Sequence, residues 1–303
     1  MSISLTNSSM ELATATTIDV IITSIQLIYG IPSLLLMIFF FFLLACSKDY
    51  RNSFHRYVQL DLLTNIICYI NTWISLRIGK YTYGIAILKT IETTYPGLLT
   101  ISAYACRVFM HMQVFTAAGL SIHRICVLRN VSLKTLGRWY PFYGLLCVIV
   151  SFFFEICLPG KTISFENEYI QLDSNGVLTK FRNMVWVKQS SYIIASFSLF
   201  YFILLALLGV VSTHLIVKNL NGSNQTLSFK KTTYRFAIVY TVIYIGVLFF
   251  TVFSALNGMM EIVPSFNLLS SAILTFGSDM MTLALPYILI AFEKNVRKLL
   301  RRK

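Results

Sequence analysis

Three side chains that could bind a polar ligand recur on one face of a long apolar stretch. Tyr104, Arg107 and His111 lie within about 60° of one another when residues are spaced at about 100° around a helix. A guanidinium inside an apolar segment is costly, and it normally faces a protein interior or a water-filled cavity. Two interpretations stay open: the three residues anchor an acidic or polar ligand, or Arg107 forms an internal ion pair, for instance with Glu155.

A second basic group stands near the far end of the same stretch. Residues 97–129 form one predicted membrane helix, in which His123 and Arg124 precede Arg129. Arg107 and Arg124 are separated by roughly 25 Å of helical rise. One end could therefore meet a ligand while His123, Arg124 and Arg129 meet a cytoplasmic partner. We expect the rest of the chain to form a bundle around this helix.

Two other apolar segments carry polar side chains at helical spacing. Asp61 and Asn65 begin one stripe, and Asp279 and Pro286 belong to another. Because lipid cannot satisfy polar groups, both stripes must face protein. Asp61 and Asp279 either form a protonation-sensitive pair that changes partners when helices move, or form static hydrogen bonds that hold helices together.

The sequence carries no pattern of an enzyme or of a metal centre. It contains no HExxH, CxxC, Gly-rich phosphate loop or GxSxG, and its six cysteines lack zinc or redox spacing. No lysine in residues 266–292 could form a retinal Schiff base. His55, His123 and His214 are interpreted as solvated helix ends rather than metal ligands. We expect no catalytic activity, no metal and no cofactor.

The composition is that of an integral membrane protein. Of the 303 residues, 56% are hydrophobic and only 12% are charged, and the mean hydropathy is +0.72. Soluble domains carry about 25% charged residues. The net charge of +13 is divided among short clusters between apolar runs, which is typical of membrane-flanking loops rather than of a nucleic-acid surface.

Seven apolar segments are long enough to cross roughly 30 Å of hydrocarbon. We predict an all-α membrane protein, a seven-helix bundle with helices at about 19–46, 53–79, 97–129, 139–158, 187–217, 233–257 and 266–292. Residues 1–18 would form an extracellular tail. Residues 293–303 would form a basic amphipathic helix on the inner leaflet.

The longest predicted outer loop, residues 159–186, has strand character. Residues 164–172 and 177–181 flank a turn signal at 173–176, which predicts a β-hairpin lying over the mouth of the bundle. The hairpin contains no cysteine that could form a disulfide to the third helix.

The distribution of basic residues predicts the topology. Seventeen of the 25 Lys and Arg residues fall on the side that holds residues 47–56, 124–138, 218–235 and the chain from 294 onward. Seven fall on the opposite side, and Arg107 lies between the two. Because cytoplasmic loops carry the excess of basic residues, the N-terminus is predicted outside and the C-terminus inside. Asn7 then belongs to the one glycosylation sequon on the outer side.

Several short segments carry a resemblance to a known family. The chain resembles G-protein-coupled receptors in general and the nematode serpentine chemoreceptors of the Srg family in particular. The segments that carry it are YGIPSL from residue 29, RNSFHR from 51, DLLTN from 61, YINTW from 69, LSIHR from 120, LPYIL from 285 and NVR from 295.

The resemblance implies a chemosensory receptor in the plasma membrane, on the cilia of sensory neurons. It would bind a small environmental molecule or a pheromone and signal to a heterotrimeric G protein. A ligand-gated channel and a transporter are the competing classes. The charge distribution disfavours a channel with its N-terminus inside, and the absence of an internal repeat disfavours a transporter.

The predicted topology can be tested by glycosylation. Asn7→Gln should abolish the glycosidase-sensitive mobility shift of the protein, whereas Asn224→Gln, on the predicted cytoplasmic side, should leave it unchanged. Gel mobility with and without glycosidase measures this. A shift that Asn224→Gln removes and Asn7→Gln retains would reverse the predicted orientation.

Overall fold

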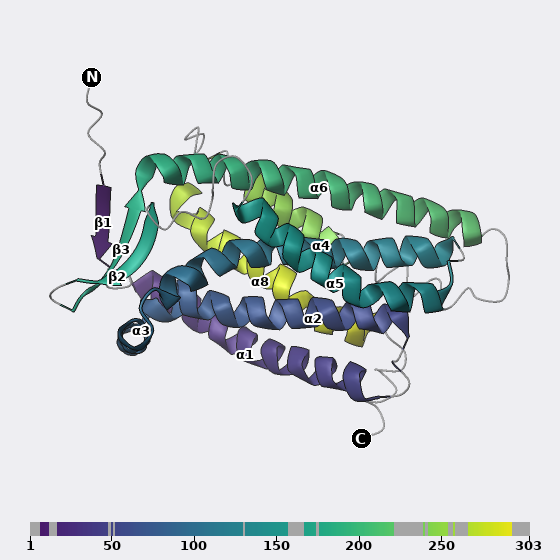
Figure 1. Cartoon of the computed structure of the whole chain (residues 1–303), viewed down its shortest axis with the longest axis horizontal. Helices are drawn as coiled ribbons and strands as arrows, with labels where there is room; N and C mark the ends of the chain where they lie inside the picture. Colours follow the sequence, from purple (N-terminus) through teal and green to yellow (C-terminus); the bar gives the residue numbers. More distant parts are fainter. Residues whose placement is uncertain are drawn as a thin grey trace.

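Long helices run side by side along the length of the molecule, and a small β-sheet lies at one end (Figure 1). The computed structural model describes residues 7–11, 17–47, 50, 52–129, 131–156, 167–173, 176–220, 239, 242–253, 257 and 266–292. Its long helices are α1 (Thr17–Cys46), α2 (Ser53–Thr72), α4 (Leu98–Leu128), α5 (Leu133–Ile156), α6 (Met184–Leu220) and α8 (Phe266–Phe292).

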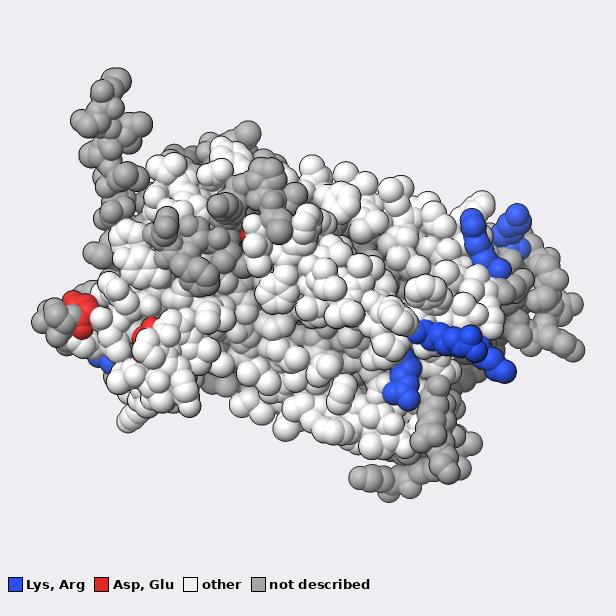
Figure 2. Space-filling model, viewed as in Figure 1, with Lys and Arg blue, Asp and Glu red and all other residues white. Residues whose placement is uncertain are grey.

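Four of the described helices, α1, α4, α5 and α6, are long and apolar enough to cross a membrane. Val242–Phe253 is a shorter apolar helix, and the Thr275–Ala291 part of α8 is also apolar. On the face shown in Figure 2, Lys and Arg side chains gather mainly at the end where α6 terminates, and an uncharged band covers the middle. The predicted all-α membrane bundle is confirmed. The count of seven spans stays a prediction.

The helix boundaries follow the predicted spans, with three differences. The predicted span 53–79 continues beyond α2 as a π-helical segment, η2 (Trp73–Arg77), and a 3-10 segment, η3 (Ile78–Lys80). The helix α5 begins at Leu133 rather than at 139. Its first turns carry the exposed basic residues Lys134 and Arg138, so they lie outside the apolar run from which the span was predicted. A further helix, α3 (Thr82–Thr94), occupies a predicted outer loop.

Two other predictions meet the limits of the described residues. Of the predicted span 233–257, the described helix covers Val242–Phe253. The predicted amphipathic helix at 293–303 lies outside the described residues.

The β-sheet contains the predicted hairpin and one unpredicted strand. Strands β2 (Glu168–Leu172) and β3 (Leu178–Asn183) pair antiparallel, so the hairpin is confirmed. The turn between them closes through a backbone hydrogen bond of 2.9 Å from Asp173 to Val177, and Gly176 adopts φ +68°. The strand β1 (Asn7–Glu11) pairs with β3, giving the order β1-β3-β2. The predicted N-terminal tail is therefore partly attached to the hairpin.

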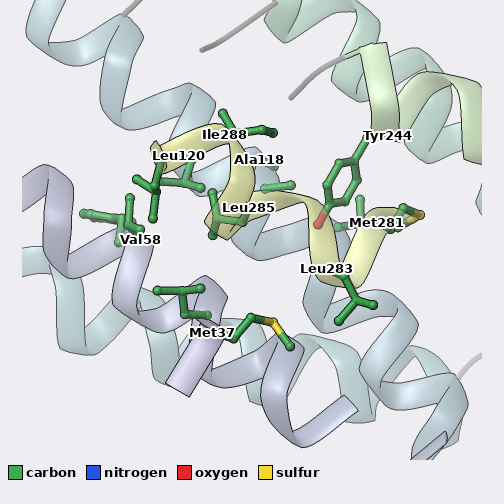
Figure 3. Packing of buried hydrophobic residues seen from close by; sticks show 14 of the residues in the cluster. Met37, Val58, Ala118, Leu120, Tyr244, Met281, Leu283, Leu285 and Ile288 are labelled. Carbon is green, nitrogen blue, oxygen red and sulfur yellow. The ribbon is translucent and has the colours of Figure 1, made fainter. Parts of the chain in front are cut away.

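The hydrophobic core is built around α8. Apolar side chains from the other helices converge on it (Figure 3). The fully buried members include Met37, Val58, Leu120, Leu285 and Leu289. Van der Waals packing of this kind, rather than removal of apolar surface from water, brings helices together in lipid.

A close approach between α4 and α5 depends on Gly119. A Cβ atom at Gly119 would overlap the ring of Tyr143, whose hydroxyl donates a hydrogen bond to the carbonyl oxygen of Phe115. Any side chain at Gly119 must therefore displace the Tyr143 ring and break this bond. Gly144 offers a matched comparison, because a Cβ there would lie 3.5 Å from Leu60, an ordinary contact distance.

We expect Gly119→Ala to destabilise the protein by about 1–3 kcal/mol, the usual cost of overpacking a core. Gly144→Ala should change stability little, because the space exists and alanine favours the helix. Thermal unfolding of the purified variants in detergent measures both. Equal melting temperatures for the two variants would contradict the close packing of α4 on α5.

Candidate functional site

Arg107 contacts the hairpin at the end of the bundle that carries the β-sheet. Its Nη2 lies 2.7 Å from Oε2 of Glu168 on β2, and Lys180 on β3 lies 3.0 Å from the other oxygen of the same carboxylate. Of the two interpretations of Arg107, the structure shows the internal ion pair, but Glu155, named as an example of the partner, is wrong. The hairpin folds back onto α4 and supplies a carboxylate, and Glu155 has a different partner.

Further contacts fix β2 against α4. The hydroxyl of Tyr104 donates to the backbone oxygen of Glu168 at 2.8 Å, and the backbone N–H of Ile170 donates to Oγ1 of Thr100 at 2.9 Å. The Arg107 guanidinium lies 4.7 Å from the ring centre of Trp186 and 5.4 Å from that of Tyr104. Ionic, hydrogen-bonding and cation–π contacts therefore position the hairpin together.

His111 belongs to a different contact, deeper in the bundle. Its Nε2 lies 2.7 Å from Oε1 of Glu155 on α5, and its Nδ1 hydrogen-bonds with the hydroxyl of Tyr201 on α6. All three side chains are buried. The structure therefore brings Tyr104 and Arg107 together, whereas His111 joins α4 to α5 and α6.

The first polar stripe forms a buried hydrogen-bond network between α2, α4 and α8. Asp61 accepts a hydrogen bond of 2.5 Å from Thr116 and one of 3.4 Å from Asn65. The amide nitrogen of Gln113 donates to Asn65 at 2.8 Å and to Thr282 at 2.9 Å. The prediction that this stripe faces protein is confirmed for its buried members.

Asp279 has partners other than Asp61. Its carboxylate forms an ion pair with Arg77 and accepts a hydrogen bond from the hydroxyl of Tyr29. Arg77 is only 2% exposed and lies 5.3 Å from the ring centres of both Tyr69 and Trp73. Arg77 is one of the seven Lys and Arg residues counted on the side opposite the basic loops, and it points into the bundle from η2. Of the two interpretations of Asp61 and Asp279, the observed contacts correspond to separate polar contacts that hold helices together. A change of partners when the helices move stays a prediction.

The need of Asp279 for a cation was the available signal for this contact. A carboxylate within a membrane helix requires a partner, so one of the basic residues had to approach it. The sequence did not identify which one, because Arg77 stands at the uncertain end of its apolar run. Pro286, the other predicted member of this stripe, is buried within α8.

Two of the three histidines at the opposite end are buried rather than solvated. His123 lies with Nε2 2.9 Å from the hydroxyl of Ser53, and His55 hydrogen-bonds with Asn52 at the start of α2. The prediction of solvated ends is wrong for these two, because both side chains find polar partners at the first turn of α2. His214, on α6, is exposed as predicted.

Arg124 is also buried and lines a cavity of about 490 Å³ between α4, α6 and the Val242–Phe253 helix. Its guanidinium lies 5.5 Å from the ring centre of Phe54. The cavity wall also contains the hydroxyl side chains of Ser121, Ser212 and Thr213. Arg129, one residue beyond α4, is exposed. The three predicted residues of this end therefore have three different environments.

The fold and these contacts define a multi-pass helical membrane protein. Its buried polar contacts are distributed along α4. The family model described as Srg family chemoreceptor matches residues 23–300, and the chain belongs to that family. This family is one of receptors rather than enzymes.

Two relatives from Caenorhabditis elegans are similar over nearly their full length. The chain is 33% identical over 290 residues to serpentine receptor class gamma-47, an alignment that covers 93% of this chain and 91% of the relative. It is 26% identical over 285 residues to serpentine receptor class gamma-53, covering 92% and 91%. The family resemblance of the short segments is therefore confirmed.

The contacts of Glu168 predict an order of stabilities. Glu168→Gln should destabilise the protein more than Arg107→Gln, because it leaves Arg107 and Lys180 together without the carboxylate. Arg107→Gln leaves Lys180 to pair with Glu168. Because the Arg107 and Lys180 side chains are 18% and 19% exposed, the loss in either variant should stay below the value of about 3–5 kcal/mol for a fully buried pair.

A double-mutant cycle on thermal unfolding in detergent measures the coupling between the two residues. Arg107→Gln with Glu168→Gln should recover part of the loss, whereas Arg107→Gln with Glu155→Gln should recover none. Recovery in the second combination instead of the first would contradict the observed pairing.

Proposed function

We propose that this Srg-family protein is a chemosensory G-protein-coupled receptor that binds a small environmental molecule or a pheromone. The observation that carries the proposal is that α4 connects the two ends of the bundle. Its residues 104 and 107 contact the hairpin, and its residue 124 lines the cavity at the opposite end. A displacement of one helix would therefore reach both ends.

The proposed orientation places the N-terminus outside the plasma membrane, on the cilia of sensory neurons. The excess of Lys and Arg at the opposite side supports it. The pairing of β1 with the hairpin also supports it, because residues 7–11 and the loop 159–186 then lie on the same side. Residues 1–18 would be extracellular, Asn7 would be glycosylated, and residues 293–303 would be cytoplasmic.

At the outer end, we propose that Tyr104 and Arg107 position the hairpin, and that His111 couples α4 to its neighbours. Because the Arg107 charge faces Glu168, an anionic ligand would have to displace that carboxylate. A neutral ligand avoids this competition. In this proposal Tyr104, Arg107 and His111 do not contact the ligand directly. They hold the hairpin and the helices that surround it.

Between the ends, the polar core is proposed to change its hydrogen bonds on activation. Pro286 has no N–H to donate to the carbonyl of Thr282, so α8 lacks one helical hydrogen bond there. The hydroxyl of the same Thr282 accepts from Gln113 on α4. Asp61 and Asn65 belong to this network, and Asp279 lies one turn away on α8, so movement of α8 relative to α4 would strain these contacts first.

At the inner end, we propose that the cavity around Arg124 receives a segment of a heterotrimeric G protein. A buried guanidinium with hydroxyl groups beside it suits backbone carbonyl and carboxylate oxygens. His123 would hold the start of α2 against α4 through Ser53, and Arg129 would contact the partner from the exposed end of the helix. This role needs neither a catalytic residue nor a cofactor.

We expect Arg124→Ala to reduce the ligand-dependent response at least about tenfold, which corresponds to the loss of roughly 1.4 kcal/mol of binding free energy. Surface expression should stay close to wild type. A calcium readout in cells with a promiscuous G protein, after a screen of small odorants and acids, measures the response.

Arg138→Ala provides the matched control. Arg138 is an exposed basic residue of α5 at the same end, so its loss should leave the response largely intact. A full response by Arg124→Ala would exclude Arg124 from coupling. A loss in both variants would show a general charge effect instead.

A further inference from the structure

A second cavity, of about 660 Å³, lies on the flank of the bundle, and we call it the flank cavity. It lies between α1, α8 and residues Val239 and Ile243. This volume is within the range of small-molecule sites, about 300–1,000 Å³. Most of its wall is apolar, with Phe276, Leu283 and Ile288 contributed by α8.

The flank cavity opens sideways, toward the surface that faces lipid. Two of its lining residues, Met280 and Tyr287, are 58% and 48% exposed, whereas Leu283 and Ile288 on the inner wall are each 4% exposed. Helix α1 is long and apolar enough to cross a membrane, and the part of α8 that lines this wall belongs to the apolar helix Thr275–Ala291. A molecule dissolved in the bilayer can therefore reach the cavity without entering through the hairpin end.

One part of the wall is polar, and its groups are matched to one another. The hydroxyl of Ser33 donates to the backbone oxygen of Tyr29 at 2.7 Å, and it lies 2.7 Å from the hydroxyl of Tyr287. The hydroxyl of Tyr287 then donates to Ser33, and its oxygen can accept a further hydrogen bond. A ligand with a hydroxyl group fits this arrangement.

The charge at the base of the cavity is already compensated. Asp279 lines the cavity, but it is paired with Arg77 and hydrogen-bonded by Tyr29. A cationic ligand would have to displace Arg77, and an anionic ligand would face the Asp279 carboxylate across an apolar medium. The cavity therefore selects a neutral molecule.

We propose that the flank cavity binds a neutral, single-chain molecule that partitions into the bilayer and carries one hydroxyl group. The hydroxyl group bonds with Tyr287 and Ser33, and the chain lies along the apolar wall of α8. The volume suits one chain rather than a two-chain membrane lipid. This inference rests on the proposed function, because it names the ligand class of the receptor. An occupant contacts Tyr29, and through it the junction of α1, α2 and α8.

Photoaffinity labelling of the full chain in phosphatidylcholine nanodiscs tests this site. The probe is hexadecan-1-ol that carries a diazirine and an alkyne. We expect saturable labelling of peptides from α1 and α8, reduced at least tenfold by excess unlabelled hexadecan-1-ol. Hexadecanoate should compete much more weakly, because its charge is excluded.

Two variants obstruct the site in different ways. Ala284→Trp fills the cavity, and Met280→Trp narrows its exposed mouth without changing the core. Both should lose the saturable labelling. Leu145→Trp, at a 59% exposed position of α5, should retain it. Thermal unfolding identifies any variant that does not fold.

Labelling that rises with probe concentration without saturating, equally in all variants, would overturn the site. Competition by added phosphatidylcholine rather than by the alcohol would assign the cavity to a membrane lipid and also overturn it. Saturable labelling without any effect of the alcohol on the calcium response would support the binding site but contradict the inference that it holds the receptor's signalling ligand. A response to another ligand without labelling would overturn the site alone.

Discussion

The contact between Arg77 and Asp279 sets a constraint that the rest of the bundle satisfies. A charged side chain within a membrane segment requires a partner, and removal of one member of a buried pair costs about 3–5 kcal/mol. The pair joins the π-helical end of α2 to α8, and the hydroxyl of Tyr29 adds α1. Because π-helical segments occur often at functional sites, the change of helix geometry at Trp73–Arg77 is consistent with a role in signalling.

Similar contacts recur at three depths along α4. At the hairpin end Arg107 shares Glu168 with Lys180, in the middle Gln113 joins α2 to α8, and at the other end Ser53 bonds with His123. The hairpin has no cysteine, so an ion pair and hydrogen bonds connect it to α4 in place of a disulfide. These contacts are non-covalent, so the hairpin and α4 could separate without breaking a covalent bond.

The sequence predicted the elements better than their contacts. Hydropathy located the long helices, and alternation with a turn signal located the hairpin, because both signals are local. The strand β1 was missed because five residues give too short an alternation. The helix α3 was missed because its 13 residues are too few to cross a membrane, so the search for spans left them in a loop. The partner of Arg107 could not be predicted, because it depends on how the strands β2 and β3 pack against α4.

The same reasoning applies to the buried polar groups. The spacing of Asp61 and Asn65 predicted correctly that they face protein, because lipid gives no alternative. Their partners come from α4 and α8, which are distant in the sequence, and periodicity contains no information about them. The buried environment of His55 and His123 was missed because their positions at the ends of apolar runs resemble those of solvated residues.

A double-mutant cycle on Arg77 and Asp279 tests most directly whether their contact joins the helices. The variants Arg77→Gln, Asp279→Asn and the combination are compared by thermal unfolding of the purified protein in detergent. Each single variant leaves one buried charge without its ion-pair partner and should lose about 3–5 kcal/mol of unfolding free energy. The double variant leaves neither charge. Its loss should be smaller than the sum of the two single losses by at least about 1 kcal/mol. Additive losses in the double variant would contradict a direct contact between the two side chains.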